Sequence, residues 1–301
     1  MSRFDVLGIG ENSLDEVYRL PSLPQPGTAT AKMQVSARTR LPGGQVATAM
    51  AACATWGLRT AYLGVFGDDE NGRVARSALA DRGVDVSPAP VRAGANRHAA
   101  IFVDERTGDR VVLWDREPAM TLGPEDVSQA LVSNARLVHV DDTDATAALR
   151  ASRLAREAGA IVTSDIESIT PDTAELVSLV SVAIFASHVP QALSGDADPA
   201  RALRALRQRH DAMLCVTRGE HGSMLLVGGT LYEEPAFPVQ AVDTTGAGDI
   251  FRAGMIYALL RGERPEMLLK WGNAAAALSC TRAGAMDSVP ALEEVDRLLR
   301  D

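Results

Sequence analysis

The stretch from Asp243 to Ile256, DTTGAGDIFRAGMI, combines small residues with two acids at the start of an apolar run. Gly246, Ala247 and Gly248 stand directly before Asp249. Successive backbone N–H groups at a helix N-terminus bind anions, and glycine lets a ligand approach closely. The stretch predicts a phosphate cradle with Asp249 as the general base that deprotonates an alcohol. The alternative is an Asp cap on a glycine turn, which leaves the Gly-Ala-Gly run unexplained.

Two N-terminal segments also fall where ligands bind in a doubly wound sheet, at the carboxyl ends of strands. In GIGENSLD, Asp15 follows a buried strand and either accepts hydrogen bonds from ligand hydroxyls or is a solvated loop acid. The segment lacks the third glycine and the helix of a dinucleotide-binding fingerprint. In PGGQVATA, Gly43 and Gly44 either admit a ligand to the backbone or form a simple helix-entry turn.

A third segment, VTRGEHGSM, sets Gly219 and Gly222 around Glu220 between two expected strands. Taken alone, it is equally typical of a hairpin loop.

Strands and helices alternate along most of the 301 residues. FDVLGIG, RTAYLGVFG, ARLVHVDD, AIVTSDIE, SVAIFAS and DAMLCVTRG are expected strands, and helical runs of 10–15 residues separate many of them. This rhythm predicts an α/β fold: a doubly wound, mostly parallel sheet with helices on both faces. Segments 15–40 and 97–117 break the rhythm, the latter as a hairpin around Glu105–Gly108, and we expect them to form a small β-sheet lid on a single domain spanning 1–301.

The overall composition excludes several classes of protein. A net charge of −9 argues against a nucleic-acid-binding surface. The acid at position 5 and the absence of a long apolar run indicate neither a signal peptide nor a membrane span, so a cytoplasmic enzyme is expected. Cys53, Cys215 and Cys280 lie far apart among apolar neighbours, which favours buried, reduced thiols.

Two stretches about 200 residues apart resemble the signatures of the ribokinase-like (PfkB) carbohydrate kinases. DTTGAGDIFRAGMI resembles the C-terminal signature, and LPGGQVATAMAACATWG…GVFGDDENG resembles the N-terminal one. The resemblance implies an ATP-dependent, Mg²⁺-requiring kinase that phosphorylates a primary hydroxyl of a sugar or sugar-like substrate. A nucleoside kinase of the same fold, or a non-catalytic sugar- or nucleotide-binding protein, is the alternative.

The resemblance also implies roles for individual residues. Asp249 would be the catalytic base and residues 246–248 the anion hole. The sugar-binding side of the site would be formed by Asp15, Gly43, Gly44 and Thr48. Around the ATP ribose and adenine would lie Thr217, Gly219, Glu220, Gly222 and Asn273. Asp243 would border a monovalent-cation loop that takes K⁺.

The chain departs from the family pattern at three places. Thr48 replaces the usual Asn, which removes a side-chain amide from the sugar side. The Asn-x-x-Glu motif is missing near Ser187–Pro190, which leaves Mg²⁺ to water, ATP phosphates and Asp165 or Glu167. Arg252, one turn after the base, would either meet a phosphate or be a surface charge.

The remaining polar residues give weaker expectations. His139 with Asp141, Asp142 and Asp144 looks like a metal-ligand cluster, but a solvated loop or helix cap is favoured. His98 and Arg110 lie in the expected lid and are candidates for substrate contact. The edges and apolar face of the lid sheet also suggest a homodimer.

Overall fold

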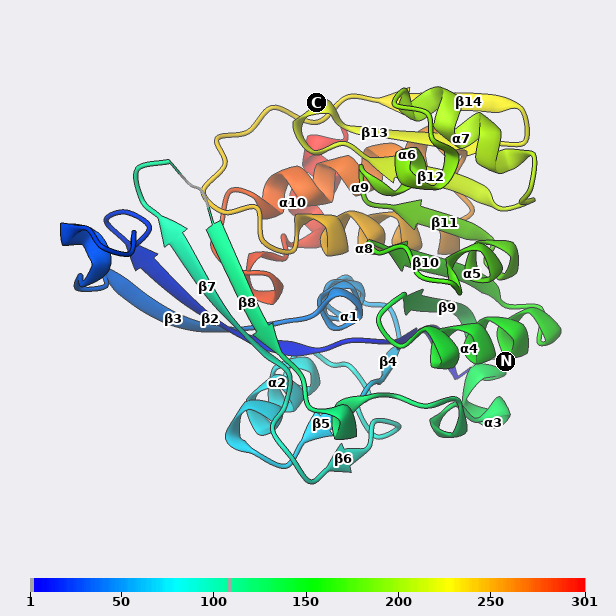
Figure 1. The fold of residues 1–301 in the computed structure, drawn as a ribbon. Coiled ribbons are helices and arrows are strands. Elements are labelled where there is room, and N and C mark those ends of the chain that lie inside the picture. Colours follow the sequence, from blue (N-terminus) through cyan, green and yellow to red (C-terminus); the bar gives the residue numbers. More distant parts are fainter. Residues whose placement is uncertain (1–2, 108–109, 301) are drawn as a thin grey trace.

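A computed structural model describes residues 3–107 and 110–300 of the chain (Figure 1). Its main sheet is mostly parallel; only the pairings of β12 with β13 and of β13 with β14 are antiparallel. In spatial order, the strands are β14 (Thr230–Glu234), β13 (Ser223–Val227), β12 (Met213–Thr217), β11 (Val182–Phe185), β10 (Ile161–Ile166), β9 (Ala135–Asp141), β1 (Phe4–Ile9) and β4 (Thr60–Leu63). The expected doubly wound α/β fold is confirmed.

Helices cover both faces of this sheet because the buried strands are apolar on both sides. One face carries α1 (Gln45–Thr55), α8 (Ala247–Leu260) and α9 (Pro265–Ser279), and α10 (Leu292–Leu298) packs on α9. The other face carries α4 (Ala145–Glu157), α5 (Thr173–Leu179) and α7 (Pro199–Arg207), with α3 (Gln129–Val132) and α6 (Val189–Ser194) beside them. The two faces form two separate hydrophobic cores.

A smaller sheet projects from one side of this body (Figure 1). Its spatial order is β3 (Ala37–Gly43), β2 (Ser13–Leu20), β7 (His98–Asp104) and β8 (Arg110–Asp115). These strands come from the two segments that break the α/β rhythm, and the hairpin joining β7 to β8 is present, although its Gly108 lies outside the described residues. Helix α2 (Glu70–Ala80) packs near the root of this sheet, beside the short strands β5 (Phe66–Gly67) and β6 (Val91–Arg92).

Short 3₁₀ turns complete the connections. They are η1 (Ala29–Ala31), η2 (Pro118–Met120), η3 (Pro124–Asp126), η4 (Gly219–His221) and η5 (Met286–Ser288). Within residues 3–107 and 110–300, every helix is too short or too polar to span a bilayer.

Candidate active site

The Gly-Ala-Gly run forms the N-terminus of α8, as the sequence predicts. Gly246 caps the helix with φ +76°, a left-handed conformation that L side chains rarely adopt. Ala247 N–H donates to Thr244 O at 3.3 Å, whereas the N–H groups of Gly246 and Gly248 have no protein acceptor within the described part of the chain. The helix start therefore presents free backbone donors and a positive dipole end to an anion.

Asp249 lies in the first turn of α8, directly after these donors. Burial raises the pKa of Asp249 well above its usual range, although the guanidinium of Arg252 opposes the shift. The negative charges of Glu167, in the loop after β10, and of Asp15, in the smaller sheet, add to the rise. A carboxylate with a raised pKa is suited to accept a proton.

Arg252 is not a surface charge, so that alternative was wrong, whereas a contact with phosphate stays a prediction. Its side chain is only 1% exposed and forms an ion pair with the fully buried Asp165 of β10. Sequence spacing correctly placed Arg252 one turn beyond Asp249, but it could not show that a carboxylate from a distant strand lies there.

Three carboxylates meet beside the helix start. Oxygens of Asp165, Glu167 and Asp249 lie within 4.8 Å of one another. Asp165 is buried, whereas the Glu167 side chain is 47% exposed. Carboxylate oxygens are the hard donors that Mg²⁺ prefers, so this donor set fits a divalent cation even though the Asn-x-x-Glu motif is absent. At the position of that motif, the chain begins α6 at Val189.

Asp15 lies in strand β2 of the smaller sheet, within the segment expected to form the lid, so only its alternative interpretation as a solvated loop acid was wrong. Its Oδ1 accepts a hydrogen bond from Ser13 Oγ at 2.9 Å, and burial raises the pKa of Asp15 to about 6. The carboxylate is held at the junction of the two sheets.

Gly43 and Gly44 join β3 to α1 beside this carboxylate. A β-carbon at position 43 would come within 2.6 Å of Asp15 Oδ2. Gly44 has φ +95° and packs against the backbone of Asn12. Thr48 on α1 is fully buried, and its hydroxyl has no hydrogen-bond partner among the described residues.

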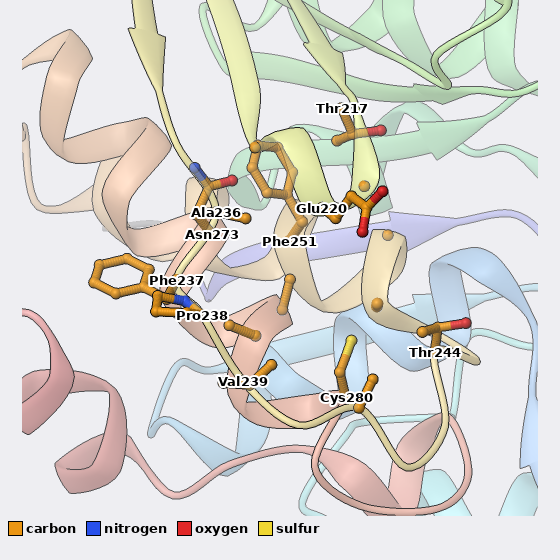
Figure 2. A pocket seen from close by; sticks show the side chains of 17 residues that line it. Thr217, Glu220, Ala236, Phe237, Pro238, Val239, Thr244, Phe251, Asn273 and Cys280 are labelled. Atoms are coloured by element: carbon orange, nitrogen blue, oxygen red, sulfur yellow. The ribbon is translucent and has the colours of Figure 1, made fainter.

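A cavity of about 540 Å³ opens beside the cradle that residues 246–248 form at the start of α8 (Figure 2). Ala247 and Gly248 form part of its wall, next to Phe251. The wall also contains all five residues expected around a nucleotide: Thr217, Gly219, Glu220, Gly222 and Asn273. A mostly apolar cavity of this size beside an anion-binding helix start suits a nucleotide, with the base in the cavity and phosphates at the helix.

Asn273 lines this cavity but uses its amide within the protein. Its Nδ2 donates to the carbonyls of Glu234 and Pro235 at 3.1 Å, and its Oδ1 accepts from Ser223 Oγ at 3.0 Å. The side chain therefore fixes the segment that leaves β14. We expected this residue to lie around the ATP ribose and adenine; it lines the cavity, and its amide anchors the wall.

Sequence reasoning missed the segment 236–239, which forms one side of the cavity in Figure 2. The sequence feature that could have indicated this segment is the apolar run AFPV in a loop. In the structure, Val239 of this run is 39% exposed. Cys280 also lines the cavity and is only half-buried, so the expectation of a core thiol was wrong there. Cys53 and Cys215 are buried, as expected.

Asp243 ties the loop before the cradle to the segment after α9. Its Oδ1 accepts from Thr245 N and Oγ1 at 2.9 and 2.7 Å, and its Oδ2 accepts from Gly284 N at 2.9 Å. Although burial opposes the shift, these hydrogen bonds lower the pKa of Asp243. The carboxylate therefore remains charged and holds two loops together.

The run from His139 to Asp144 is largely buried, so its interpretation as a solvated loop was wrong, whereas the helix-cap alternative is confirmed for Asp144, the N-cap residue of α4. His139 Nδ1 lies 2.9 Å from Thr163 Oγ1, and burial lowers the pKa of His139 to about 3. Asp141 accepts a hydrogen bond from Glu11 N at 2.7 Å. These residues support the strand end and do not form a metal-ligand cluster within the described residues.

The two other acids of this run fix neighbouring loops. Asp142 Oδ2 accepts from the N–H groups of Glu167 and Ser168 at 3.0 and 2.6 Å, which positions the loop after β10. Asp144 forms an ion pair with Arg116 at 2.7 Å. Asp142 is thus a support for Glu167 that the sequence did not reveal.

The smaller sheet reaches the cradle loop through Arg110. Its Nη1 lies 3.4 Å from Thr245 Oγ1. On the same face of this sheet as Asp15, the register places Ala99 and Trp114. Asp15 and Arg110 are therefore carried by one sheet whose face is turned toward the helix start.

Comparison with known proteins gives one consistent family. Residues 9–292 match the pfkB family of carbohydrate kinases. The chain is 30% identical to the ATP-dependent ribose-1-phosphate kinase of Halopiger xanaduensis over 98% of each sequence. It is 28% identical to fructokinase-1 of Oryza sativa subsp. japonica, over 98% of this chain and 97% of that protein.

Solved structures show the same fold. The ribokinase of Arabidopsis thaliana, complexed with ribose and ATP, superposes with a TM-score of 0.86 at 23% identity over the full length of both chains. A protein assigned as a ribokinase II from E. coli, solved with ATP and Mg²⁺, superposes with a TM-score of 0.86 at 21% identity over 99% of each chain.

Proposed function

The chain belongs to the pfkB family of carbohydrate kinases, which are ATP-dependent phosphotransferases, and we propose that it phosphorylates a primary hydroxyl of a sugar or sugar-like substrate. One observation carries the proposal: Asp249 directly follows the free N–H groups of the α8 start, and the smaller sheet that bears Asp15 reaches the loop before this helix through Arg110 and Thr245. A base, an anion site and a hydroxyl-binding carboxylate are the parts that this reaction needs.

In the proposed reaction, the acceptor hydroxyl donates its proton to Asp249 as its oxygen attacks the γ-phosphorus of ATP. The new O–P bond forms while the bond from the γ-phosphorus to the β–γ bridging oxygen breaks, and ADP leaves. The N–H groups of residues 246–248 stabilise the charge on the transferring phosphoryl group.

On the acceptor side, Asp15 accepts hydrogen bonds from sugar hydroxyls, while Gly43 and Gly44 leave room for the substrate. The sheet bearing Asp15 acts as a lid, and Arg110 links it to the cradle loop through Thr245. Closing such a lid would exclude water from the phosphoryl group.

On the nucleotide side, the 540 Å³ cavity takes the adenosine part of ATP. Thr217, Gly219, Glu220 and Gly222 bound the cavity along the β12–β13 turn, while Asn273 holds the opposite wall in place. Mg²⁺ bound with ATP would neutralise phosphate charge, and Glu167 and Asp249, beside the Arg252-paired Asp165, are the residues placed to hold it. The Asp243 loop is the proposed edge of a K⁺ site.

A nucleoside is the second candidate substrate because the lid carries an exposed ring. Trp114 is 63% exposed and shares its sheet face with Asp15, so it offers a stacking surface for a base. Aromatic residues make up only 4% of the chain, which favours the sugar.

ADP release from Mg²⁺-ATP, measured with a panel of ketoses, aldoses, sugar acids and nucleosides, tests the proposal. We expect turnover with at least one sugar and its phosphorylated product by mass spectrometry. Turnover with nucleosides alone would favour the second candidate. ATP binding without turnover on any member of the panel would indicate a non-catalytic binding protein and contradict the proposal.

A further inference from the structure

Arg252 is an arginine in an environment where arginine is rare. It is among the largest fully buried side chains of the described residues, at 1% exposure. Charged side chains are almost never fully buried unless they are paired. It lies one helical turn after Asp249, so both side chains emerge from the same side of α8.

The guanidinium is clamped between a strand and the helix that carries it. Its Nη2 pairs with Asp165 Oδ1 and lies 3.8 Å from Glu167 Oε1. Its Nη1 lies only 2.6 Å from where a β-carbon on Gly248 would stand. Gly248 must therefore be glycine not only for the ligand but also for this arginine.

The same guanidinium touches the acidic cluster that fits a divalent cation. Asp165 and Glu167, its two partners, are two of the three carboxylates whose oxygens lie within 4.8 Å of one another. Both oxygens of Asp165 lack a well-formed hydrogen bond among the described residues, as do Nε and Nη2 of Arg252. The pair is therefore held by charge and retains unused bonding capacity.

We propose that Arg252 is a built-in counter-cation of the phosphoryl-transfer centre, which keeps Asp165 from binding a free divalent cation in the nucleotide-free enzyme. Glu167 and Asp249 then remain for the metal ion that arrives with the nucleotide. The inference rests on the proposed kinase site, but it concerns only the charge balance of this cluster. Arg252 acts through the carboxylates and is a positioning residue.

Removing the positive charge should convert the cluster into a metal site. Without the guanidinium, no positive charge would neutralise Asp165, Glu167 and Asp249. Asp165 is fully buried, and a buried carboxylate without a partner strongly destabilises the folded state. A divalent cation would restore the balance, and a ligand that binds only the folded state raises its stability.

The experiment titrates Mn²⁺ into the nucleotide-free full chain and follows free Mn²⁺ by electron paramagnetic resonance. We expect Arg252→Met to bind one Mn²⁺ at least tenfold more tightly than the wild type. Arg252→Lys, which keeps the charge, should resemble the wild type. Adding Glu167→Gln to Arg252→Met should weaken the new site. Equal Mn²⁺ affinity in the wild type and Arg252→Met would overturn the proposal.

The response of thermal unfolding to Mn²⁺ provides a second readout, because the loss of a merely structural ion pair would lower the unfolding temperature without recovery on adding the metal. Arg252→Met should unfold at a lower temperature than the wild type in EDTA and recover on adding Mn²⁺. Asp165→Asn/Arg252→Met removes both charges and should fold without any Mn²⁺ response. If the single variant folds in neither condition while the double variant folds, Arg252 is only the structural partner of Asp165, and its proposed role in excluding a metal ion is wrong. None of these measurements depends on the sugar or on turnover, so they stand apart from the substrate panel.

Discussion

Gly43 lies directly beneath the carboxylate of Asp15, so that a β-carbon at position 43 would come within 2.6 Å of Asp15 Oδ2 and 3.0 Å of Ser13 Oγ. The register of β2 with β3 creates this contact, because it pairs Ser13 with Gly43 at the root of the smaller sheet. The absence of a side chain at one residue thus sets the position of the charge at the other.

Gly43→Ala should therefore displace Asp15 and weaken sugar binding. Gly43 has no left-handed φ, so alanine introduces a steric conflict and no backbone strain. Losing well-placed hydrogen bonds to a charged group costs about 1.5–3 kcal/mol, which predicts a rise in the sugar KM of roughly tenfold or more. Steady-state kinetics checks this with Gly229→Ala as a matched control, since nothing lies within 4 Å of a β-carbon there. An unchanged KM for the sugar would show that Asp15 is not a sugar ligand.

Asp249→Asn should abolish turnover while leaving nucleotide binding intact. The amide cannot accept the proton of the acceptor hydroxyl, and general-base catalysis contributes about 10²–10⁴-fold. Asp249 is not among the residues that line the ATP cavity, so the shape of the cavity should not change. Stopped or coupled assays give kcat, and calorimetry gives the ATP affinity. Turnover within tenfold of the wild type would remove Asp249 from the base role.

Asp15 gives a pH-dependent stability prediction. Burial raises its pKa from 3.8 to about 6, so the folded state holds the proton more tightly than the unfolded state. The stability from this group is complete below about pH 4 and is lost as pH rises through 6. Above pH 6 the ionised carboxylate costs up to about 3 kcal/mol, and Asp15→Asn should be more stable than the wild type by part of that.

Urea unfolding of the substrate-free proteins at pH 4, 6 and 8 measures this difference. The variant and the wild type should converge at pH 4 and separate at pH 8, with the variant higher. At pH 8 the same variant should bind sugar more weakly, since the charge that costs stability is the one that accepts hydroxyl hydrogen bonds. If Asp15→Asn were less stable than the wild type at pH 8, the ionised carboxylate would stabilise the folded state, which contradicts the prediction.

The lid sheet should mediate a homodimer. Its edge strand β8 exposes four consecutive large apolar side chains, from Val111 to Trp114, at 44–63%. An exposed apolar edge strand is a template for association. Light scattering should give twice the mass of the 31.9 kDa chain, and Leu113→Glu should reduce it to one chain. Val91→Glu, at a valine 52% exposed outside the lid, is the matched control. A wild-type mass of one chain would exclude the dimer.

The sequence by itself determined the fold and the centre of the site, because both depend on local patterns. Apolar strands alternating with helices favour a parallel sheet whose faces are covered by helices. The cradle is a property of seven consecutive residues, DTTGAGD, whose geometry follows from a glycine turn entering a helix. Even the lid could be located, because its strands break the α/β rhythm.

Only the tertiary structure decided how the remaining polar residues are used. Burial and pairing depend on which distant segments meet, and spacing along the chain does not encode this. Arg252 is a buried counter-ion because strand β10 places Asp165 against helix α8. Asn273 became a wall anchor because the backbone leaving β14 passes over α9. The physical reason is the same in each case: a buried polar group takes the partner that packing brings to it.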